Sequence, residues 1–478
     1  MSGKNWLLHI PRFPDNLYWG LLEIKNIFEV NDSEIHLIDV NHKIYKHFFD
    51  TPYWQDIDSF GLMNKGKIPL FKLTRLILRE LSFIQKNDRV FFSVFSTESR
   101  SWATLISILL RKWFDVKIFI GGNGIYAPGE SEAESVWADY MLEHNLVDAV
   151  FMNQADETLP EAIKNNFNTS GKIYKETKVF PNLGFLPKHL TVDPYKDNRV
   201  YDSIYYREDL EHPALKDELL GIEWAFKIHS TLGCVKQCTF CDVPVIQKWV
   251  MRKAEDVVEE IKHYYTTTGS THFFLGDSTC NGSTSEWMKL LEGVYKLQQE
   301  IETPIYWNSQ FALKPANRVS EEQFELIAKT NFHPSPGMDH CSDRVLHHMR
   351  KKYTWEDMLY HIDMFAKHDI WIRDALWMIG YPTETEEDVQ EYDKLFSRLR
   401  SKKHTFVSNV VNVTYMNRNS PLLDIVNIDW NDPNKWTAQN GALTQEVRMN
   451  RKKKLDTEFT SIGKLKYKFR DSYRRALR

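Results

Sequence analysis

Short apolar runs alternate with amphipathic stretches along most of the chain, and this alternation restricts the fold to the α/β class. In the first third, five runs rich in β-branched and aromatic residues are the candidate strands: 6–10, 34–40, 89–96, 116–120 and 149–152. Helical spacing of apolar residues is clearest at 73–84 and 102–113. Because a helix after each strand returns the chain to the same edge of a sheet, residues 1–165 are predicted to form a doubly wound parallel sheet.

The alternation resumes from residue 224 to residue 416. Helical patterns there separate six strand candidates: 226–230, 272–276, 304–311, 333–339, 370–380 and 405–415. Six β/α repeats predict a partial (β/α)6 barrel, in which the carboxyl ends of the strands carry the chemistry. Residues 166–223 are expected to form a polar connector, and residues 417–478 a C-terminal extension with a basic tail.

Three cysteines, Cys234, Cys238 and Cys241, lie on one short loop directly after the first strand of this second domain. A [4Fe–4S] cluster normally takes four cysteines, so three would leave one iron open to bind a substrate or cofactor. A structural zinc site needs four ligands, whereas the remaining cysteines, Cys280 and Cys341, are isolated. Five cysteines in 478 residues are too few, and odd in number, for a disulfide framework. The loop is therefore predicted to hold an iron–sulfur cluster.

The spacing CxxxCxxC, with Phe240 before the third cysteine, resembles the signature of the radical S-adenosylmethionine (SAM) enzymes. Residues 337–354 resemble that family's GxESGSDxVLxxMxKxxT stretch, and residues 380–388 resemble its GxPxET.ED turn. The resemblance implies that the open iron chelates SAM, and that one electron cleaves the sulfonium to a 5′-deoxyadenosyl radical. It further implies an electron donor such as flavodoxin or ferredoxin, and it places Phe240 near the cofactor.

Polar residues on the second and third strands of this domain are candidate SAM contacts. Gly276 and Asp277 follow the second strand, where the family holds the SAM amino group; a helix cap is the alternative role for Asp277. Asn308 and Gln310 share one face of the third strand and are expected to point into the barrel. They would suit ribose hydroxyls, or form a buried network of their own.

Two charged residues on later strands complete the candidate site. Asp339 stands where many members of the family have glutamate. Arg373 is a charge within an otherwise apolar fifth strand and needs a partner there. The SAM carboxylate is one candidate partner, and Asp374 or Asp339 is the other.

The first domain resembles the cobalamin-binding domain that precedes the SAM barrel in one branch of the family. The resemblance rests on Leu37-Ile38-Asp39, on the Gly121-Gly122-Asn123 loop after the fourth strand, and on the acidic segment 155–158. It implies a cobalamin site at Gly121, Gly122 and Asn123. The DxHxxG motif is missing, and Asn153-Gln154-Ala155-Asp156-Glu157 replaces the usual Gly-Glu-Gly-Glu. An empty domain used for substrate contact or packing is the alternative.

The resulting hypothesis is a radical SAM enzyme that performs cobalamin-dependent methyl transfer to an unactivated centre. The alternatives are hydrogen abstraction without cobalamin, modification of a nucleic acid, and a non-enzymatic, metal-stabilised binding module. Methylthiolating members need a second cluster on N-terminal cysteines, and no cysteine precedes Cys234.

Charge and hydropathy bound the partners. The net charge of −4 gives no global reason to expect nucleic acid, but residues 448–478 are strongly basic and would contact phosphates or form a solvated helix. No apolar run approaches the roughly 20 residues that a membrane helix needs. The N-terminus lacks the pattern of a signal peptide. A cytoplasmic protein without a membrane contact is expected.

Overall fold

The computed structural model divides into two compact units, Met1–Leu219 and Leu220–Arg478. The structure describes residues 3–11, 19–48, 70–94, 99–125, 135–152, 155–174, 225–241, 243, 249–268, 271–416, 420–428 and 435–462. Most of the predicted connector 166–223 lies outside these residues. Within them, no helix is long and apolar enough to cross a membrane.

The first unit is built on a six-stranded sheet with the order β2-β1-β3-β4-β5-β6, in which all neighbouring strands run parallel. The strands are β1 (Asn5–His9), β2 (His36–Asp39), β3 (Arg89–Ser93), β4 (Lys117–Gly121), β5 (Ala149–Phe151) and β6 (Gly171–Ile173). The first five confirm the sequence prediction. The sixth was missed because its three residues are all half-buried and carry no apolar run.

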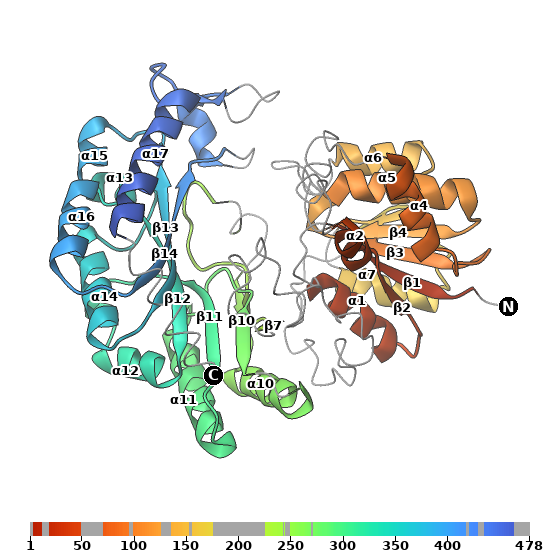
Figure 1. Ribbon diagram of the computed structural model, residues 1–478, viewed down its shortest axis with the longest axis horizontal. Coiled ribbons are helices and arrows are strands. Elements are labelled where there is room, and N and C mark those ends of the chain that lie inside the picture. The colour runs from red at the N-terminus through yellow and green to blue at the C-terminus, as the bar shows by residue number, and fades with distance from the viewer. Residues whose placement is uncertain are drawn as a thin grey trace. The chain divides into compact units, whose positions relative to one another are not determined.

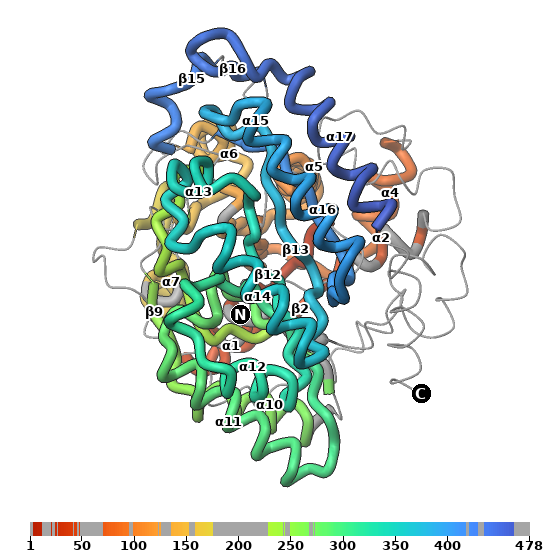
Figure 2. Tube along the Cα trace, turned by 90° about the vertical axis from the view of Figure 1, so that its left-hand side faces the viewer, coloured from red at the N-terminus to blue at the C-terminus, as the bar shows by residue number. Residues whose placement is uncertain are grey.

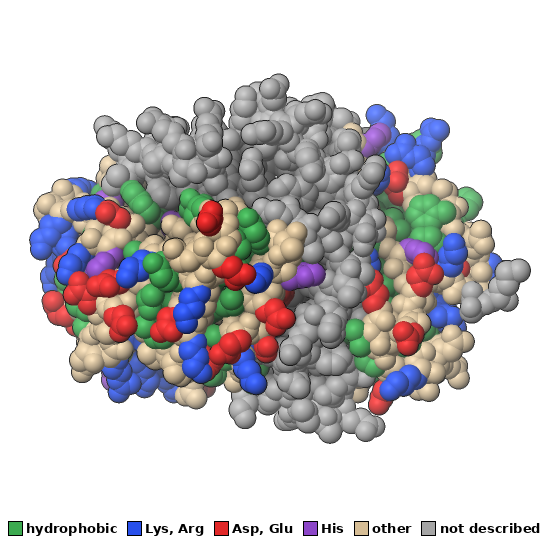
Figure 3. Space-filling view, turned by 90° about the horizontal axis from the view of Figure 1, so that it is seen from below, with side chains coloured by type: hydrophobic (Ala, Val, Ile, Leu, Met, Phe, Trp, Pro, Cys, Tyr) green, Lys and Arg blue, Asp and Glu red, His purple; other side chains and the backbone are tan. Residues whose placement is uncertain are grey.

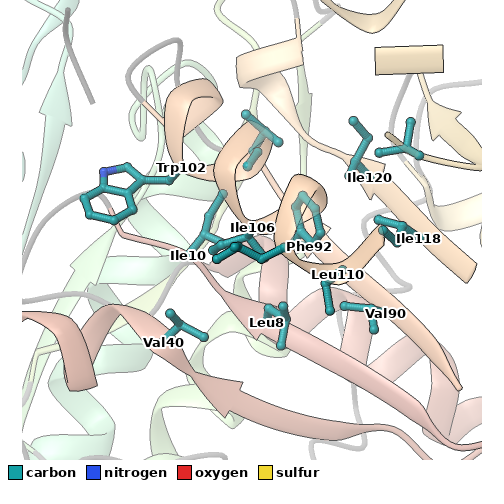
Figure 4. Packing of buried hydrophobic residues seen from close by; sticks show 14 of the residues in the cluster. Leu8, Ile10, Val40, Val90, Phe92, Trp102, Ile106, Leu110, Ile118 and Ile120 are labelled. Carbon is teal, nitrogen blue, oxygen red and sulfur yellow. The ribbon is translucent and has the colours of Figure 1, made fainter. Parts of the chain in front are cut away.

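Helices cover both faces of this sheet, which makes it doubly wound (Figure 1). On one face, α2 (Val40–Phe48), α4 (Leu70–Glu80), α5 (Ser99–Trp113) and α6 (Val136–Glu143) pack on Leu8, Phe92 and Ile120 (Figure 4). On the other, α1 (Trp19–Val30) and α7 (Ala155–Lys164) pack on Leu7 and Phe91. Consecutive residues of β1 and β3 thus enter opposite cores, as the period of a strand requires.

The second unit carries six parallel strands in the order β14-β13-β12-β11-β10-β7. They are β7 (Ala225–Ile228), β10 (His272–Leu275), β11 (Tyr306–Phe311), β12 (Phe332–Asp339), β13 (Ile372–Ile379) and β14 (Phe406–Val413). Helices alternate with them: α10 (Ala254–Thr268), α11 (Thr284–Ile301), α12 (Glu321–Lys329), α14 (Trp355–Lys367) and α16 (Tyr392–Ser401). The α/β class and the parallel strands are confirmed, and the partial-barrel layout remains a prediction.

Shorter elements complete this unit. They are β8 (Thr231–Leu232), β9 (Val250–Met251), α13 (Asp343–His348), α15 (Glu386–Gln390), β15 (Val426–Asn427) and β16 (Thr437–Ala438). A final helix, α17 (Gln445–Ile462), packs beside α16 and against β14 (Figure 2). On the face drawn in Figure 3, basic and acidic side chains are interspersed rather than segregated.

Candidate active site

The cysteine loop follows the carboxyl end of β7, where the chemistry of a β/α domain is expected. Strand β8 and the left-handed Gly233, with φ of 69°, turn the chain into Cys234. Cys234, Cys238 and Cys241 are partly exposed and form no disulfide. The structure thus presents three thiols on one loop at the carboxyl edge of the sheet.

Hydrogen bonds from several distant segments fix this loop. Thr279, after β10, lies 2.9 Å from the Cys234 sulfur through its hydroxyl. The Thr239 hydroxyl lies 2.8 Å from that of Tyr381, after β13, and Ser420 donates to the Thr239 carbonyl at 2.8 Å. The loop is therefore held from three sides before any cofactor is bound.

A buried cation stands beside the second cysteine. Lys351 forms an ion pair with Asp339, lies close enough to Cys238 to influence the pKa of its thiol, and lies 5.1 Å above the ring of Phe240. Burial raises the pKa of the Cys238 thiol, and the ammonium of Lys351 opposes that rise. Burial opposes the charge on Lys351, but Asp339 and Cys238 together raise its pKa well above the ordinary value.

A further lysine, Lys236, lies within the loop itself. Burial and the nearby Lys351 lower its pKa, whereas the sulfurs of Cys238 and Cys234 raise it. Two lysines thus lie at the loop, while burial keeps the pKa of the Cys238 thiol above its ordinary value.

Asp277 lies at the end of β10 with its side chain buried. Its Oδ1 accepts from the backbone N–H groups of Ser230 and Thr231 at 2.9 and 3.0 Å, and its Oδ2 accepts from the Ser230 hydroxyl. Ser283, and not Asp277, caps the following helix α11. Asp277 thus ties the β7–β8 turn, which leads into the cysteine loop, to β10; the preceding Gly276 donates to Ile228 in β7.

The two amides on β11 lie on one face, as expected. Asn308 and Gln310 are half-buried, and they alternate with buried Trp307 and Phe311, which pack on the opposite side. Asn308 Oδ1 is shielded from solvent and has no hydrogen-bond partner among the described residues. A buried acceptor without a donor indicates a place for a ligand group, so the geometry favours Asn308 as a binding residue.

Arg373 lies elsewhere. It is the second residue of β13, six positions before Ile379, so the strand carries it about 20 Å from the catalytic edge. Its guanidinium lies 3.5 Å from Asp374, and both side chains are more than one-third exposed. The partner of Arg373 is thus Asp374, one of the alternatives that the sequence left open. The position of Arg373 does not support a contact with SAM.

The turn after β13 surrounds the buried carboxylate of Glu384, for which the sequence predicted no partner. Glu384 Oε2 accepts from the N–H of Gly380 at 2.8 Å and lies 3.3 Å from Nε2 of His340. Its Oε1 lies 2.7 Å from Arg451 on α17. The side chains of Glu384 and His340 are 0% exposed. The C-terminal helix therefore fixes the turn that follows β13.

The Arg448 side chain packs against the same turn. It is 1% exposed, donates to the carbonyl of Trp436 at 2.5 Å, and lies 3.8 Å above the Trp436 ring. A methyl group at Gly380 would lie 2.6 Å from Arg448, so only glycine fits beneath it. Arg448, the first residue of the predicted basic tail, is therefore part of the domain interior, whereas Lys453 and Lys454 on the same helix are exposed. Residues 463–478 lie outside the described residues.

In the first unit, Gly121 ends β4, and Gly122 adopts φ of 105°. A Cβ at Gly122 would lie 2.6 Å from the carbonyl oxygen of Val94, which follows β3. This glycine is needed for the loop to approach the protein's own backbone. Asn123 begins a short 3-10 turn, and nothing further is described of its side chain. The sheet order has a switch point between β1 and β3, the place where such sheets bind ligands.

A histidine–carboxylate pair lies at the carboxyl ends of β1 and β2 and was missed from the sequence. His9 ends β1 and Asp39 ends β2, and Nδ1 of His9 lies 3.0 Å from Oδ1 of Asp39, with both side chains buried. The sequence signal that could have predicted this pair is a polar residue at the end of each of two adjacent strands. Asn153 and Gln154 lie outside the described residues.

Among the described residues, no three His, Cys, Asp or Glu side chains converge as ligands of a single metal ion. The thiolates of a multi-iron cluster do not bind one common iron, so their sulfurs need not converge in this way. A donor set of three thiols on one loop, none of them in a disulfide, suits such a cluster.

Comparison with known proteins places this site in a family. Residues 228–396 match the family model of the Radical SAM superfamily. The chain is 26% identical over 352 residues to a putative methylthiotransferase of Methanocaldococcus jannaschii, covering 71% of this chain and 72% of that protein. From Hydrogenobaculum sp. (strain Y04AAS1), a ribosomal protein uS12 methylthiotransferase and a tRNA-2-methylthio-N(6)-dimethylallyladenosine synthase are each 28% identical, over 33% and 46% of this chain. The chain spans 40% and 54% of the length of these two relatives.

Among solved structures, the fold resembles the cobalamin-dependent S-adenosylmethionine radical enzyme OxsB with aqua-cobalamin bound. The TM-score is 0.53 at 11% sequence identity, and the match covers 85% of this chain and 53% of that one. At this identity the likeness concerns the fold alone.

Proposed function

We propose that this chain, a member of the radical SAM superfamily through residues 228–396, reductively cleaves SAM at a [4Fe–4S] cluster held by Cys234, Cys238 and Cys241. The observation that carries the proposal is the cysteine loop itself: three thiols, none of them in a disulfide, after the carboxyl end of β7. A cluster bound there would supply an open iron for SAM and the electron that breaks the sulfonium bond.

The protein's own residues would position the loop and the substrate. Thr279 and Thr239 hold the loop, and Asp277 orders the turn that leads into it. The unpartnered Oδ1 of Asn308 faces the same side of the sheet as Gln310 and would accept from a hydroxyl of SAM. Arg373 is not assigned a role in this proposal.

Methyl transfer with cobalamin in the first unit is the finer proposal. The sheet order with its switch point at β1 and β3 supports it, together with the fold likeness to OxsB. The space at Gly122, however, is filled by the backbone of Val94 and does not by itself form a cradle for a corrin.

Modification of RNA or of a ribosomal protein is a second candidate, because the relatives are named for such substrates. Attachment of a methylthio group in particular has weaker support. The only cysteines beyond the loop, Cys280 and Cys341, are both buried, and they are far apart in the sequence. This chain thus offers no second set of cysteines for a further cluster.

Anaerobic reconstitution with iron and sulfide tests the proposal. Wild-type protein should bind about four irons per chain, give an electron paramagnetic resonance (EPR) signal on reduction that changes when SAM is added, and cleave SAM. Cys238→Ala should lose all three properties, whereas Cys341→Ala, at a buried cysteine outside the loop, should keep them. Stoichiometric zinc without iron uptake in the wild type would contradict the proposal.

The cobalamin question has its own experiment. Protein incubated with hydroxocobalamin and then desalted should retain close to one equivalent. Retention of none by a wild type that still cleaves SAM would favour the hydrogen-abstraction alternative.

A further inference from the structure

Lys351 occupies a constrained position between α13 and α14. Arg350 adopts φ of 58°, a left-handed conformation that ends α13 and redirects the chain. The N–H of Lys351 then donates to the carbonyl of Leu346 at 2.9 Å. The Lys351 side chain is 12% exposed, whereas its neighbour Lys352 is exposed. The backbone therefore sends one of two consecutive lysines into the interior.

Asp339 holds the ammonium in that position. This carboxylate ends β12 with φ of 59°, and its side chain is 9% exposed. Tyr353 donates to Asp339 Oδ2 at 3.2 Å, while its hydroxyl also lies 2.8 Å from the carbonyls of Gly337 and Met338. With Asp339 fixed by Tyr353 and paired with Lys351, the ammonium cannot move far.

The same ammonium also lies beside the cysteine loop. It lies 5.1 Å above the ring of Phe240, and it is close enough to Cys238, two residues earlier, to influence the pKa of that thiol. Lys351 thus lies beside both a proposed ligand and the aromatic residue that precedes the third cysteine.

We propose that Lys351 is a positioning residue that fixes Cys238 and Phe240, and that its buried positive charge makes the cluster easier to reduce. The inference rests on the proposed function, because it requires a cluster at the loop. The reduction potential of an iron–sulfur cluster depends on net charge, on hydrogen bonds to its sulfurs and on exposure to solvent. Reduction adds one negative charge, so a fixed cation close to a ligand sulfur stabilises the reduced state more than the oxidised state.

Asp339 should affect the reduction potential in the opposite direction. Its negative charge offsets that of Lys351, so removing it alone should raise the potential, whereas removing the lysine should lower it. A merely structural pair would not give shifts of opposite sign; both changes would instead weaken iron retention.

The test is an EPR-monitored redox titration of the reconstituted full chain, with dithionite as the electron source and without substrate. Lys351→Met should keep four irons, have a lower reduction potential than the wild type, and give a smaller reduced fraction at a fixed applied potential. Asp339→Asn should shift the potential upward. Lys351→Arg, which keeps the charge, should lie closest to the wild type, and Lys352→Met is the matched control and should not shift.

Lys351→Met leaves the Asp339 charge buried without its partner, so this variant is at risk of misfolding. If it fails to fold, the iron content and the reduction potential of the charge-neutral double variant Lys351→Met/Asp339→Asn decide the matter. The potential of this double variant should show neither the downward shift expected for Lys351→Met nor the upward shift expected for Asp339→Asn. An unchanged potential in a Lys351→Met variant with four irons would overturn the inference. Absence of iron from the wild type would instead overturn the proposed function, so the two failures are distinguishable.

Discussion

Replacing Arg451 by methionine should destabilise the second unit by about 3 kcal/mol. Arg451 Nη1 lies 2.7 Å from Oε1 of Glu384, whose side chain is 0% exposed. Removing one partner of a buried ion pair costs about 3–5 kcal/mol because the other charge stays buried and uncompensated. Oε2 of Glu384 keeps its bond from Gly380 and its contact with His340, so we expect the lower end of that range. For a unit of this size, the melting temperature should fall by roughly 6–12 °C.

Urea unfolding followed by tryptophan fluorescence measures this change in the free energy of unfolding. Lys453→Met, an exposed lysine of the same helix, is the matched control and should change stability by less than about 0.5 kcal/mol. The double variant Arg451→Met/Glu384→Gln should recover part of the loss, since no buried charge remains. If Arg451→Met proves as stable as the Lys453 control, α17 does not hold the turn through this pair and the reasoning is wrong.

Three further predictions concern acid stability, the first unit and the cysteine loop. Burial lowers the pKa of His361 to about 4, so the folded state stays neutral while the unfolded state takes up a proton below pH 6.5. Stability should therefore be lost as the pH falls from 6.5 to 4, by about 3 kcal/mol, and a His361→Leu variant should show a correspondingly shallower pH profile of urea midpoints. Gly122→Ala should destabilise the first unit by roughly 1–3 kcal/mol in urea titrations, more than Gly171→Ala, which has a positive φ but open space at its Cβ; equal costs would show that the contact with the backbone does not matter. Asp277→Ala should reduce iron retention after reconstitution because the turn at Ser230 loses its acceptor; full retention with weaker SAM binding would return Asp277 to a direct ligand role.

Much of the architecture was predictable because the signals are local. All six strands of the parallel sheet in the second unit coincide with strand candidates read from the sequence, as do the first five strands of the first unit. The position of the cysteine loop after β7 follows from the order of the elements alone. The missed strand, β6, is three residues long and half-buried, so no periodic pattern marked it.

The site was less predictable, because its partners are distant in sequence. Asp277 was recognised as a candidate, but the N–H groups that donate to its carboxylate lie 46 and 47 residues earlier, at Thr231 and Ser230. Arg373 was recognised as a charge that needs a partner, but only the strand register shows that it stands at the amino end of β13. A basic tail was also correctly seen, while the inward direction of Arg448 was not.

The sequence by itself determined the α/β class, the parallel strands and the three-thiol loop, since apolar periodicity and the spacing of cysteines are properties of neighbouring residues. Only the tertiary structure decided what surrounds that loop. The approach of Lys351 to Cys238 depends on a left-handed residue and a buried carboxylate, and that of Arg451 to Glu384 joins residues 67 positions apart. Burial makes each of these charges costly to leave unpaired. The pairing that satisfies them is therefore set by packing, which no local pattern records.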